Sequence, residues 1–528
     1  MAKLAKYLNQ LTVGNVYDAP EILEAYATDR SVLKIKPKLV ALPESTDDVR
    51  KLMRFCYQLA IKGIRVPVAV RGSGLDEMGA DLSNGMVISM EKMNKLLESD
   101  KRERLVRVQS GITLKELNTA LSMNGLTVPI GGRDNETVGG LISNGATDIY
   151  AGKYGGITKY VERLEVVLAN GDIVQTGRLG KVAANRKASE KTLEGMIYRR
   201  LMKLTGRKTK LLNAIHETNL GKAGYPMAAY INKGGAMDLM PIFFGAEGTL
   251  GVITEVILRA IPLEQKSERV VATFEDIETA QKFLDLANSL KPKELSIYDI
   301  RVVKSVSESG KRLSSIAEKL TSGFVVFARF DHKGRAAIRK LASVKGVLPK
   351  TSQFITDGMK TRVALDEFEN SLVSFLNQSK NGERVPLLTN FYVPEKNLGG
   401  FLSDIKILEN SLKLELAVYG SYATNNYNIR PKFDVSDPEF NKKAVTFLRT
   451  GAFIINRQGG SPTGGAPEGR VKAIVTNTEI PEEQVELYTE IKNIFDKYNI
   501  MNPGVKLGAD TRFTLRHFRD GAVGKIVI

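Results

Sequence analysis

The chain has 528 residues, which is too long for one compact hydrophobic core, so two or three domains are expected. Its 43% hydrophobic and 26% charged residues are typical of a globular protein, and its single cysteine, Cys56, excludes an internal disulfide framework and a CxxC redox or zinc site. The net charge of +17 favours an anionic partner: nucleic acid, anionic lipid or an acidic substrate.

The N-terminal third predicts an ordinary α/β succession. Residues 1–7 lack the apolar core of a secretion signal, and no apolar run approaches the length of a membrane span, so we expect a cytoplasmic protein. Residues 20–62 predict a helix, an extended connector and a second helix, for which Ser45 is the N-cap. Residues 66–70 predict a buried strand that runs directly into a glycine-rich turn.

The next stretch contains a hairpin and a basic insertion. Residues 164–175 predict a β-hairpin with Asn170-Gly171 as its two-residue turn. Residues 178–242 form a basic insertion, in which the densest run of positive charge, residues 199–210, is expected on one helix face. That face is either simply solvated or a contact for an anionic membrane surface. Nothing in the chain resembles a nucleic-acid-binding module.

The pattern changes near residue 262. Strands alternate with amphipathic helices from there on, which indicates a separate α+β domain. We therefore expect three parts: residues 1–262 with the insertion at 178–242, a second domain at 263–480, and a C-terminal segment, 481–528, that packs back on the first domain.

Three glycine-rich turns dominate the first part. They lie at residues 71–75, at 129–145 and at 244–254. Glycine allows close approach of a ligand to the backbone, and successive N–H groups in such turns bind anions, so three turns indicate a long ligand with phosphates in its middle. A nicotinamide-binding GxGxxG site is excluded because the third glycine is missing after Gly74, and a P-loop is excluded because no Gly-Lys-Ser/Thr triplet occurs.

The ordered set of motifs resembles the FAD-linked oxidases, the superfamily that includes vanillyl-alcohol oxidase, and among them the glycolate oxidase D-subunits and D-lactate dehydrogenases. The motifs that carry the resemblance are Tyr26-Ala-Thr-Asp29, Arg71-Gly-Ser-Gly74, Val108-Gln-Ser-Gly111, Thr137-Val-Gly-Gly140, Asn144-Gly145, Gly245-Ala-Glu-Gly-Thr-Leu-Gly-Val-Ile-Thr254 and Asn502-Pro-Gly504. This resemblance implies an α+β fold: a two-subdomain FAD-binding domain, an α+β substrate or cap domain, and a helical C-terminal return.

The resemblance also implies which residues hold FAD. They are Arg71, Gly72, Ser73, Gly74, Leu75, Gly131, Gly132, Thr137, Gly139, Gly140, Asn144, Gly145, Glu247, Gly248, Thr249, Leu250, Gly251, Val252 and Ile253. Relatives with covalent flavin carry a histidine after the first turn, where this chain has Leu75. We therefore expect noncovalent FAD.

Relatives of the glycolate and D-lactate type hold a divalent metal with two motifs in the second half, roughly G-H-x-G-D-G-N-x-H and G-E-H-G-x-G. Here the first motif resembles residues 420–428, followed by Arg430-Pro431, and the second resembles residues 463–470. Ser421 and Asn428 stand at the metal-binding histidines, and Gly465 and Ala466 replace the Glu-His pair. Because a transition metal prefers imidazole or carboxylate ligands, we expect no metal.

The base that takes the hydroxyl proton must then come from elsewhere. Candidates are Tyr419, Tyr422, Tyr427 and Glu468, with Tyr427 and Glu468 as the catalytic candidates carried forward. For a substrate carboxylate, Arg430 is the main candidate and Arg362 a second one, because a guanidinium grips a carboxylate bidentately.

Three functions remain open. The first is oxidation of a small anionic hydroxy acid by noncovalent FAD without a metal. The second is a sugar or aldonolactone oxidase or dehydrogenase of the same superfamily, and the third is a flavin-binding subunit that has lost turnover. The predicted partners are a small carboxylate substrate and an electron acceptor that the sequence does not identify, with possible peripheral contact to an anionic membrane and no nucleic acid.

Overall fold

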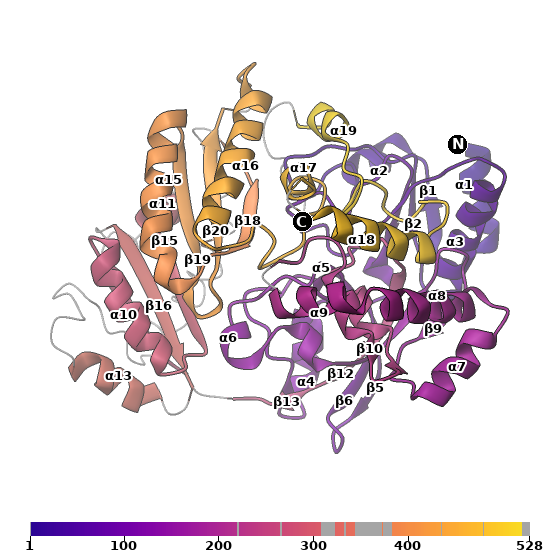
Figure 1. Cartoon of the computed structure of the whole chain (residues 1–528), viewed down its shortest axis with the longest axis horizontal. Helices are drawn as coiled ribbons and strands as arrows, with labels where there is room; N and C mark the ends of the chain where they lie inside the picture. Colours follow the sequence, from indigo (N-terminus) through magenta and orange to yellow (C-terminus); the bar gives the residue numbers. More distant parts are fainter. Residues whose placement is uncertain are drawn as a thin grey trace.

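A computed structural model gives the fold. It describes residues 2–218, 221–264, 267–307, 323–331, 334–343, 372, 383–434, 436–478 and 480–519. Figure 1 shows two bodies, a larger one built from the first half of the chain with the C-terminal segment and a smaller one built from the pink-red and orange segments. No helix in the described ranges is long and apolar enough to cross a membrane.

The first subdomain is a small sheet in the order β1-β2-β4-β3, in which β2 and β3 both run parallel to β4. The strands are β1 (Asn15–Tyr17), β2 (Leu39–Leu42), β3 (Val68–Arg71) and β4 (Met86–Ser89), and the helices are α1 (Ala2–Leu11), α2 (Pro20–Ala25) and α3 (Thr46–Ile61). Ser45 caps α3 as predicted, since its side chain accepts a hydrogen bond from the N–H of Asp48. Strand β3 ends where the first glycine-rich turn begins.

The second subdomain is an antiparallel sheet in the order β5-β6-β12-β8-β9. Its strands are β5 (Leu96–Asp100), β6 (Leu105–Gln109), β8 (Val161–Val167), β9 (Ile173–Gln175) and β12 (Val252–Arg259), with a separate pair β7 (Leu126–Thr127) and β13 (Ile261–Pro262). Helices α4 (Leu114–Ser122), α5 (Val138–Asn144) and α6 (Ala151–Tyr154) lie between β6 and β8 in the chain. The predicted hairpin is confirmed, because β8 pairs with β9, but the two-residue turn at Asn170-Gly171 is wrong. The N–H of Gly171 donates to the Leu168 carbonyl at 2.9 Å and the N–H of Leu168 donates to the Asp172 carbonyl at 2.8 Å, so the loop has three residues, with Gly171 at φ 84°.

The basic insertion forms mostly helices. They are α7 (Lys181–Ser189), α8 (Leu193–Arg207) and α9 (Thr209–Thr218), followed by the short strands β10 (Asn232–Lys233) and β11 (Ala236–Met237). The C-terminal helix α18 (Glu482–Phe495) packs beside α8, and its Leu487, Ile491 and Phe495 join the apolar core of this subdomain.

The smaller body is an antiparallel sheet of seven described strands in the order β14-β16-β15-β19-β20-β17, with β18 also beside β20. The strands are β14 (Glu268–Phe274), β15 (Glu294–Asp299), β16 (Phe324–Phe330), β17 (Glu383–Arg384), β18 (Leu388–Tyr392), β19 (Glu415–Ser421) and β20 (Asn426–Phe433). Its helices are α10 (Ile277–Ser289), α11 (Ile300–Ser307), α13 (Gly334–Ser343), α15 (Leu398–Leu412) and α16 (Phe440–Arg457), whereas the short helices α17 (Ala473–Thr476) and α19 (Thr511–Arg516) lie with the larger body in Figure 1. We call the smaller body the cap domain.

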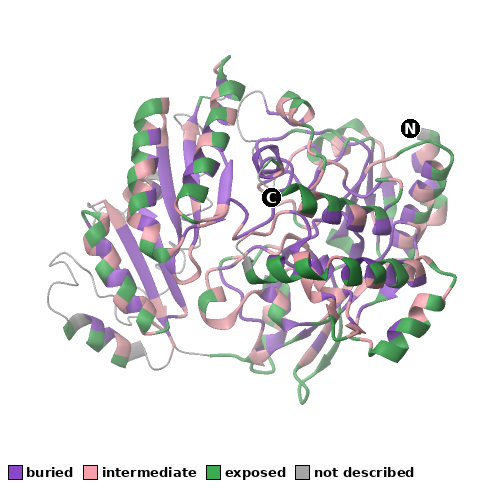
Figure 2. Ribbon diagram, viewed as in Figure 1, coloured by how far each residue is buried: buried purple, intermediate pink, exposed green. Residues whose placement is uncertain are grey.

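Alternation along the cap strands separates a core face from a polar face. Leu295, Ile297, Val418 and Ile429 join the core formed with α10, α15 and α16, and Figure 2 shows these strands as largely buried. Side chains of opposite parity, such as Ser296 and Ser421, line a cavity between the cap and the first body. The α+β fold predicted from the sequence is therefore confirmed, and its sheet positions the functional site.

Candidate active site

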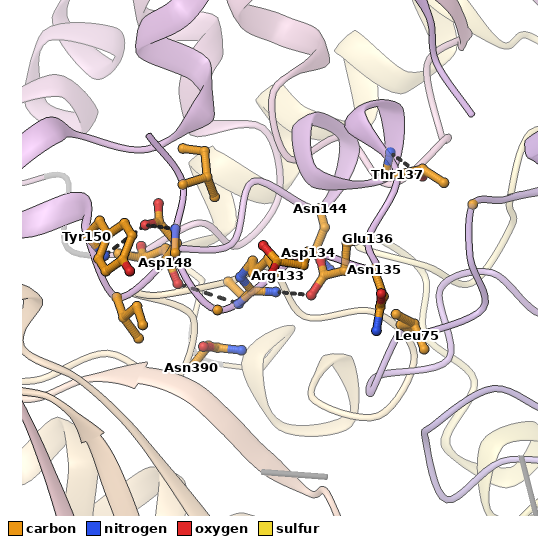
Figure 3. A pocket seen from close by; sticks show the side chains of 18 of the residues that line it. Leu75, Arg133, Asp134, Asn135, Glu136, Thr137, Asn144, Asp148, Tyr150 and Asn390 are labelled. Atoms are coloured by element: carbon orange, nitrogen blue, oxygen red, sulfur yellow. Dashed lines mark hydrogen bonds and ion pairs between the residues drawn. The ribbon is translucent and has the colours of Figure 1, made fainter. Parts of the chain in front are cut away.

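A cavity of about 780 Å³ lies where the two subdomains of the first body meet the polar face of the cap sheet. All three glycine-rich turns contribute to its wall, together with β15, β19 and β20 of the cap. Figure 3 shows the part of this wall that comes from residues 131–150, with Asn390 of the cap domain opposite. Because the wall includes all three glycine-rich turns and three cap strands, one cavity could hold both a dinucleotide and a substrate.

The first turn follows strand β3 without a helix. Gly74 has φ 69°, a left-handed backbone conformation that favours glycine. Gly72 leaves space for a neighbour, because a Cβ atom there would lie 2.3 Å from the Thr137 hydroxyl oxygen. The N–H groups of Ser73, Gly74 and Leu75 donate no hydrogen bond within the described part of the chain. Such free amides beside a cavity suit the oxygen atoms of a phosphate.

The second turn is fastened by side chains. The hydroxyl of Thr137 caps α5 by accepting a hydrogen bond from Gly140 N at 3.2 Å, and a Cβ atom on Gly139 would lie 2.6 Å from the Cβ of Ser110. Gly131 lies against Tyr150, whose ring would be 2.7 Å from an added Cβ. The glycines therefore allow segments 110, 131–140 and 150 to pack tightly around the cavity.

The third turn combines cavity wall and core. Glu247, which adopts φ 52°, lines the cavity together with Gly248, Gly251 and Ile253. Thr249, by contrast, is fully buried and its hydroxyl contacts the Tyr225 hydroxyl at 2.8 Å. This turn is thus held by the core on one side and open to the cavity on the other.

Most of the residues assigned to FAD by resemblance line the cavity. They are Gly72, Ser73, Gly74, Leu75, Gly131, Gly132, Thr137, Gly139, Gly140, Asn144, Glu247, Gly248, Gly251 and Ile253. The structure places the others behind the wall: Arg71, Gly145, Thr249, Leu250 and Val252. Arg71 donates to the Thr28 carbonyl at 2.9 Å, and Gly145 ends α5 in the left-handed conformation, so both shape the turns from behind.

The residues present fit FAD. The free amides of the first turn, the glycines that a Cβ would block, and the unpartnered buried oxygens of Ser110 and Asn144 all lie along one continuous cavity. An extended ligand with oxyanions and ring edges could satisfy these groups.

Arginines dominate the end of the cavity nearest the cap. Glu77 follows the first turn and makes an ion pair with Arg430 of β20, which is fully buried. Burial alone would raise the pKa of Glu77. The guanidinium groups of Arg430, Arg30 and Arg133 nevertheless hold this pKa below its usual value. Arg133 is bonded to Glu136 at 2.8 Å, whereas Arg30 lines the cavity and its buried Nε has no partner among the described residues.

The four positions that the resemblance assigns to metal-motif residues come together in the structure. Ser421, Asn428 and Ala466 all line the cavity, and Gly465 lies beside them, donating its N–H to the Asn390 carbonyl at 2.8 Å. A Cβ atom on Gly465 would lie 2.3 Å from the side-chain oxygen of Asn426. Neutral amides and hydroxyls therefore occupy this part of the wall, and a carboxylate side chain at residue 465 would not fit without rearrangement.

The other predicted substrate and catalytic residues lie outside the cavity wall. Tyr427 is on the core face of β20, packed against Phe391, because it has the opposite parity to Asn426 and Asn428. Glu468 is fully buried, accepts the Gly224 N–H at 2.9 Å and pairs with Lys506 at 3.3 Å.

The two predicted arginines have different outcomes. Arg430 shares the cavity-side parity of β20 but lies one layer behind the wall, against Glu77 and the hydroxyl of Tyr419 at 3.2 Å. Arg362 lies outside the described residues. Of the other tyrosines considered, Tyr419 lines the cavity, and Tyr422 lies in the cap core and donates its hydroxyl to the exposed Asp285.

One carboxylate in the wall has an acid–base character that the sequence did not indicate. Asp148 is 3% exposed; its Oδ1 accepts the N–H groups of Gly131 at 3.1 Å and Tyr150 at 2.8 Å, and its Oδ2 has no partner among the described residues. Burial raises the pKa of Asp148 to about 6. Its neighbour Thr147 donates to the Gly465 carbonyl at 2.7 Å, so Asp148 lies close to the position of Ala466.

A second acidic group lies under the first turn. Asp29, Asp76 and Asp81 have carboxylate oxygens within 4.8 Å of one another, the one such cluster that could hold a metal among the residues described. Burial and neighbouring carboxylates raise the pKa of Asp76 to about 7. Arg71 lies 3.9 Å from Asp81 and Arg519 lies 3.8 Å from Asp29, so cationic side chains already compensate this cluster.

Two family sequence models match the chain. One is described as an FAD binding domain and matches residues 37–177, and the other is described as the C-terminal domain of FAD linked oxidases and matches residues 263–505. The chain belongs to the FAD-linked oxidases. It is an FAD-dependent oxidoreductase, and the predictions of this family and of FAD as the cofactor are confirmed.

Several relatives of this FAD-linked oxidase carry the names of enzymes that act on hydroxy acids. The chain is 24% identical to the glycolate oxidase subunit GlcD of Bacillus subtilis over 90% of both chains, and 26% identical to a D-lactate dehydrogenase of Archaeoglobus fulgidus over 91% of this chain and 95% of the relative. It is also 24% identical to a D-2-hydroxyglutarate dehydrogenase of Pseudomonas putida, but spans only 49% of that protein.

Solved structures support the fold of this FAD-linked oxidase. A 4-ethylphenol oxidase from Gulosibacter chungangensis has a TM-score of 0.69 at 15% identity, with 96% of both chains covered. An alkyldihydroxyacetonephosphate synthase has a TM-score of 0.64 at 16% identity and covers 95% of this chain and 84% of its own.

Sequence reasoning missed several wall residues. Arg30 directly follows the motif Tyr26-Ala-Thr-Asp29, and Asp148 follows Asn144-Gly145 by three residues, so both could have been found by asking which charged residues adjoin the motifs. Ser296 and Tyr298 of β15 carried a weaker signal, the period-two alternation of a strand with one polar face.

Proposed function

We propose that this oxidase converts a small 2-hydroxy acid into the 2-oxo acid without a bound metal ion. In this reaction the C2–H bond breaks with its electron pair, the hydroxyl proton leaves, and a C=O double bond forms. FAD, when bound, supplies the acceptor for the hydride. The names of the relatives and the set of neutral side chains at the metal-motif positions support the proposal.

The chain offers a cation for the substrate carboxylate. Arg30 lines the cavity at the cap end, and its Nε is buried without a partner in the described residues. A guanidinium–carboxylate hydrogen bond contributes about 1.5–3 kcal/mol, so an unsatisfied donor here favours an anionic substrate. Arg430, with its charge compensated by Glu77, would act from behind by fixing Glu77 and Tyr419.

The observation that carries the metal-free proposal is the wall around Ser421. Ser421 and Asn428 present a hydroxyl and an amide group, and Ala466 presents a methyl group, where the resemblance places histidines. Asn426 and Asn390 add two further amides to this wall. Neutral amide and hydroxyl groups are weak ligands for transition metals but good hydrogen-bond partners for a substrate hydroxyl or carboxylate.

Asp148 is the proposed proton acceptor. It is the cavity-wall carboxylate that combines proximity to the 465–466 loop, an unpartnered oxygen and a pKa of about 6, which leaves it ionised at neutral pH. A base with a pKa near the operating pH gives the best combination of ionised fraction and basicity. Tyr419 fits less well, because burial raises the pKa of its phenol even though Arg430 opposes that effect.

We also propose that the basic face of α8 makes peripheral contact with an anionic membrane. Arg199, Arg200 and Lys203 are exposed on one stretch of this helix, while Leu201 and Leu204 pack inward. Each such cation near an anionic bilayer is worth about 1 kcal/mol, so three to five of them give weak, salt-sensitive binding.

A donor screen tests the proposed substrate class. The purified protein is mixed anaerobically with D-lactate, glycolate, D-2-hydroxyglutarate, sugars and aldonolactones, and flavin absorbance is followed. Bleaching by hydroxy acids supports the proposal. Bleaching by sugars or lactones alone would support the second function, and a flavin that no donor reduces would support a subunit without turnover.

A further inference from the structure

The outer part of the cavity is built where the segment of residues 150–154 meets two cap strands. Tyr150 and Tyr154 come from the first body, and Lys293 and Arg329 come from the edge of the cap sheet next to β15 and on β16. All four residues line the cavity. Tyr150 also packs against Gly131, but none of the four residues belongs to the glycine-rich turns or to the neutral wall around Ser421.

The other charged groups around Lys293 have partners of their own. Arg329 lies 3.3 Å from Glu294 and donates to the Tyr150 hydroxyl at 2.8 Å, and Lys153 pairs with Asp331. The remaining nearby acid, Glu264, is exposed and accepts the Tyr154 hydroxyl at 2.9 Å.

No carboxylate of the described chain is in ion-pair contact with the Lys293 ammonium. Its nitrogen instead lies 4.5 Å from the centre of the Tyr150 ring and 5.9 Å from that of Tyr154. Ring faces hold a cation in place without neutralising its charge. The half-buried ammonium at a cavity wall is therefore oriented and still available to an anion.

The strand register relates Lys293 to the centre of the site. Ser296 pairs with Ser421 across β15 and β19, and Lys293, which lies three residues before Ser296 and just ahead of β15, also lines the cavity. Three residues of strand span roughly 10 Å. An extended substrate whose hydroxyl lies near Ser421 would thus reach Lys293 with its far end.

We propose that Lys293, Tyr150 and Tyr154 form a subsite for a second oxyanion on the substrate, so that the preferred substrate is a 2-hydroxy acid with a carboxylate or phosphate at its other end. Lys293 binds the oxyanion, and the two rings hold the ammonium in place. This inference rests on the proposed function for the hydroxy-acid part, but anion binding at Lys293 can be tested without turnover.

The binding test uses the FAD-loaded protein and unreactive acids. Glutarate, a dicarboxylate, and butyrate, a monocarboxylate of similar length, are titrated while the flavin spectrum is followed, in wild type and in Lys293→Met, Lys293→Arg and Lys291→Met. Lys291 is an exposed lysine two residues away that does not line the cavity, and it controls for a simple loss of charge. Loss of one charge-assisted contact predicts glutarate binding about 10-fold to 100-fold weaker in Lys293→Met, with butyrate binding and the Lys291→Met variant unchanged. Lys293→Arg should retain most of the preference.

The kinetic test separates the two oxyanions. KM for D-2-hydroxyglutarate, for 3-phosphoglycerate and for D-lactate is measured in the same variants. A rise in KM for either dianion but not for lactate supports the subsite and identifies its oxyanion. Equal weakening of glutarate and butyrate, or no change in either, overturns it. If glutarate binding depends on Lys293 while no hydroxy acid reduces the flavin, the subsite stands and the proposed function fails.

Discussion

The two walls of the cavity differ in how far they keep the pattern of their family. The wall from the first body keeps the glycine-rich turns, the capped helix α5 and the free amides of residues 73–75. In the cap wall β19 and β20 pair in regular register, and polar uncharged side chains stand at Ser421 and Asn428, where the resemblance places histidines. A cofactor held by backbone groups constrains glycines and turns, whereas a substrate held by side chains leaves the sheet free to change its chemistry.

The largest effect is expected in the wall from the first body, where we expect FAD to bind. In Gly72→Val the new side chain would begin 2.3 Å from the Thr137 hydroxyl, so the turn must shift and FAD occupancy should fall at least about tenfold. The ratio of absorbance at 450 nm to that at 280 nm in purified protein measures it. Gly206→Ala in α8, where nothing lies within 4 Å of the new atom, is the matched control. If the Gly72→Val protein contained as much FAD as wild type, the first turn would have no role in binding the cofactor.

The next effect concerns the proposed base. Asp148→Asn should retain FAD and lower the rate of flavin reduction by about 10²–10⁴-fold, the usual contribution of a positioned base. In wild type the rate should rise with pH through about 6 and then level off, because the carboxyl acts only when ionised. Anaerobic stopped-flow measurement of flavin bleaching gives both results. Asp172→Asn in the β8–β9 turn serves as control, and an unchanged pH profile in Asp148→Asn contradicts the assignment.

The ion pair between the walls should matter for stability. Glu77→Gln or Arg430→Met alone leaves a buried charge without its partner, which typically costs about 3–5 kcal/mol. The double variant should recover much of that loss, since the two effects are coupled. Urea unfolding followed by circular dichroism measures the cycle, and additive losses would show that the two side chains act independently.

A smaller effect is expected for carboxylate recognition. Arg30→Met should raise KM for the hydroxy acid about tenfold or more and leave the cofactor bound, because it removes one charge-assisted hydrogen bond to the substrate. Steady-state kinetics with an artificial electron acceptor provide the measurement. If FAD is lost instead of substrate affinity, Arg30 serves the cofactor.

The smallest effect is expected at the surface. Replacing Arg199, Arg200 and Lys203 with glutamine should abolish sedimentation with vesicles that contain anionic lipid at low salt, while flavin reduction by the donor stays unchanged. Equal sedimentation of the variant and wild type would mean that this helix face is only solvated.

The sequence predicted the fold and the cofactor better than the substrate side. The Ser45 cap and the β8–β9 hairpin form from a few neighbouring residues, so both could be predicted from the sequence, although the hairpin loop is one residue longer than predicted. Tyr427 illustrates the limit: its place on the core face of β20 depends on strand parity, which a motif alignment alone does not give. Asp148, Arg30 and Lys293 matter through neighbours far away in sequence, such as Gly465, Glu77 and Tyr150, and only the folded chain brings these together.

Removal of metal from the protein shows whether the proposed oxidation needs a metal ion. The protein is treated with a chelator, its metal content is measured by mass spectrometry, and the flavin is then mixed anaerobically with a 2-hydroxy acid that reduces the untreated protein. We expect the flavin to bleach at the original rate with far less than one metal ion per chain, and added zinc or manganese to have no effect. A flavin that bleaches only after metal is restored would contradict the account.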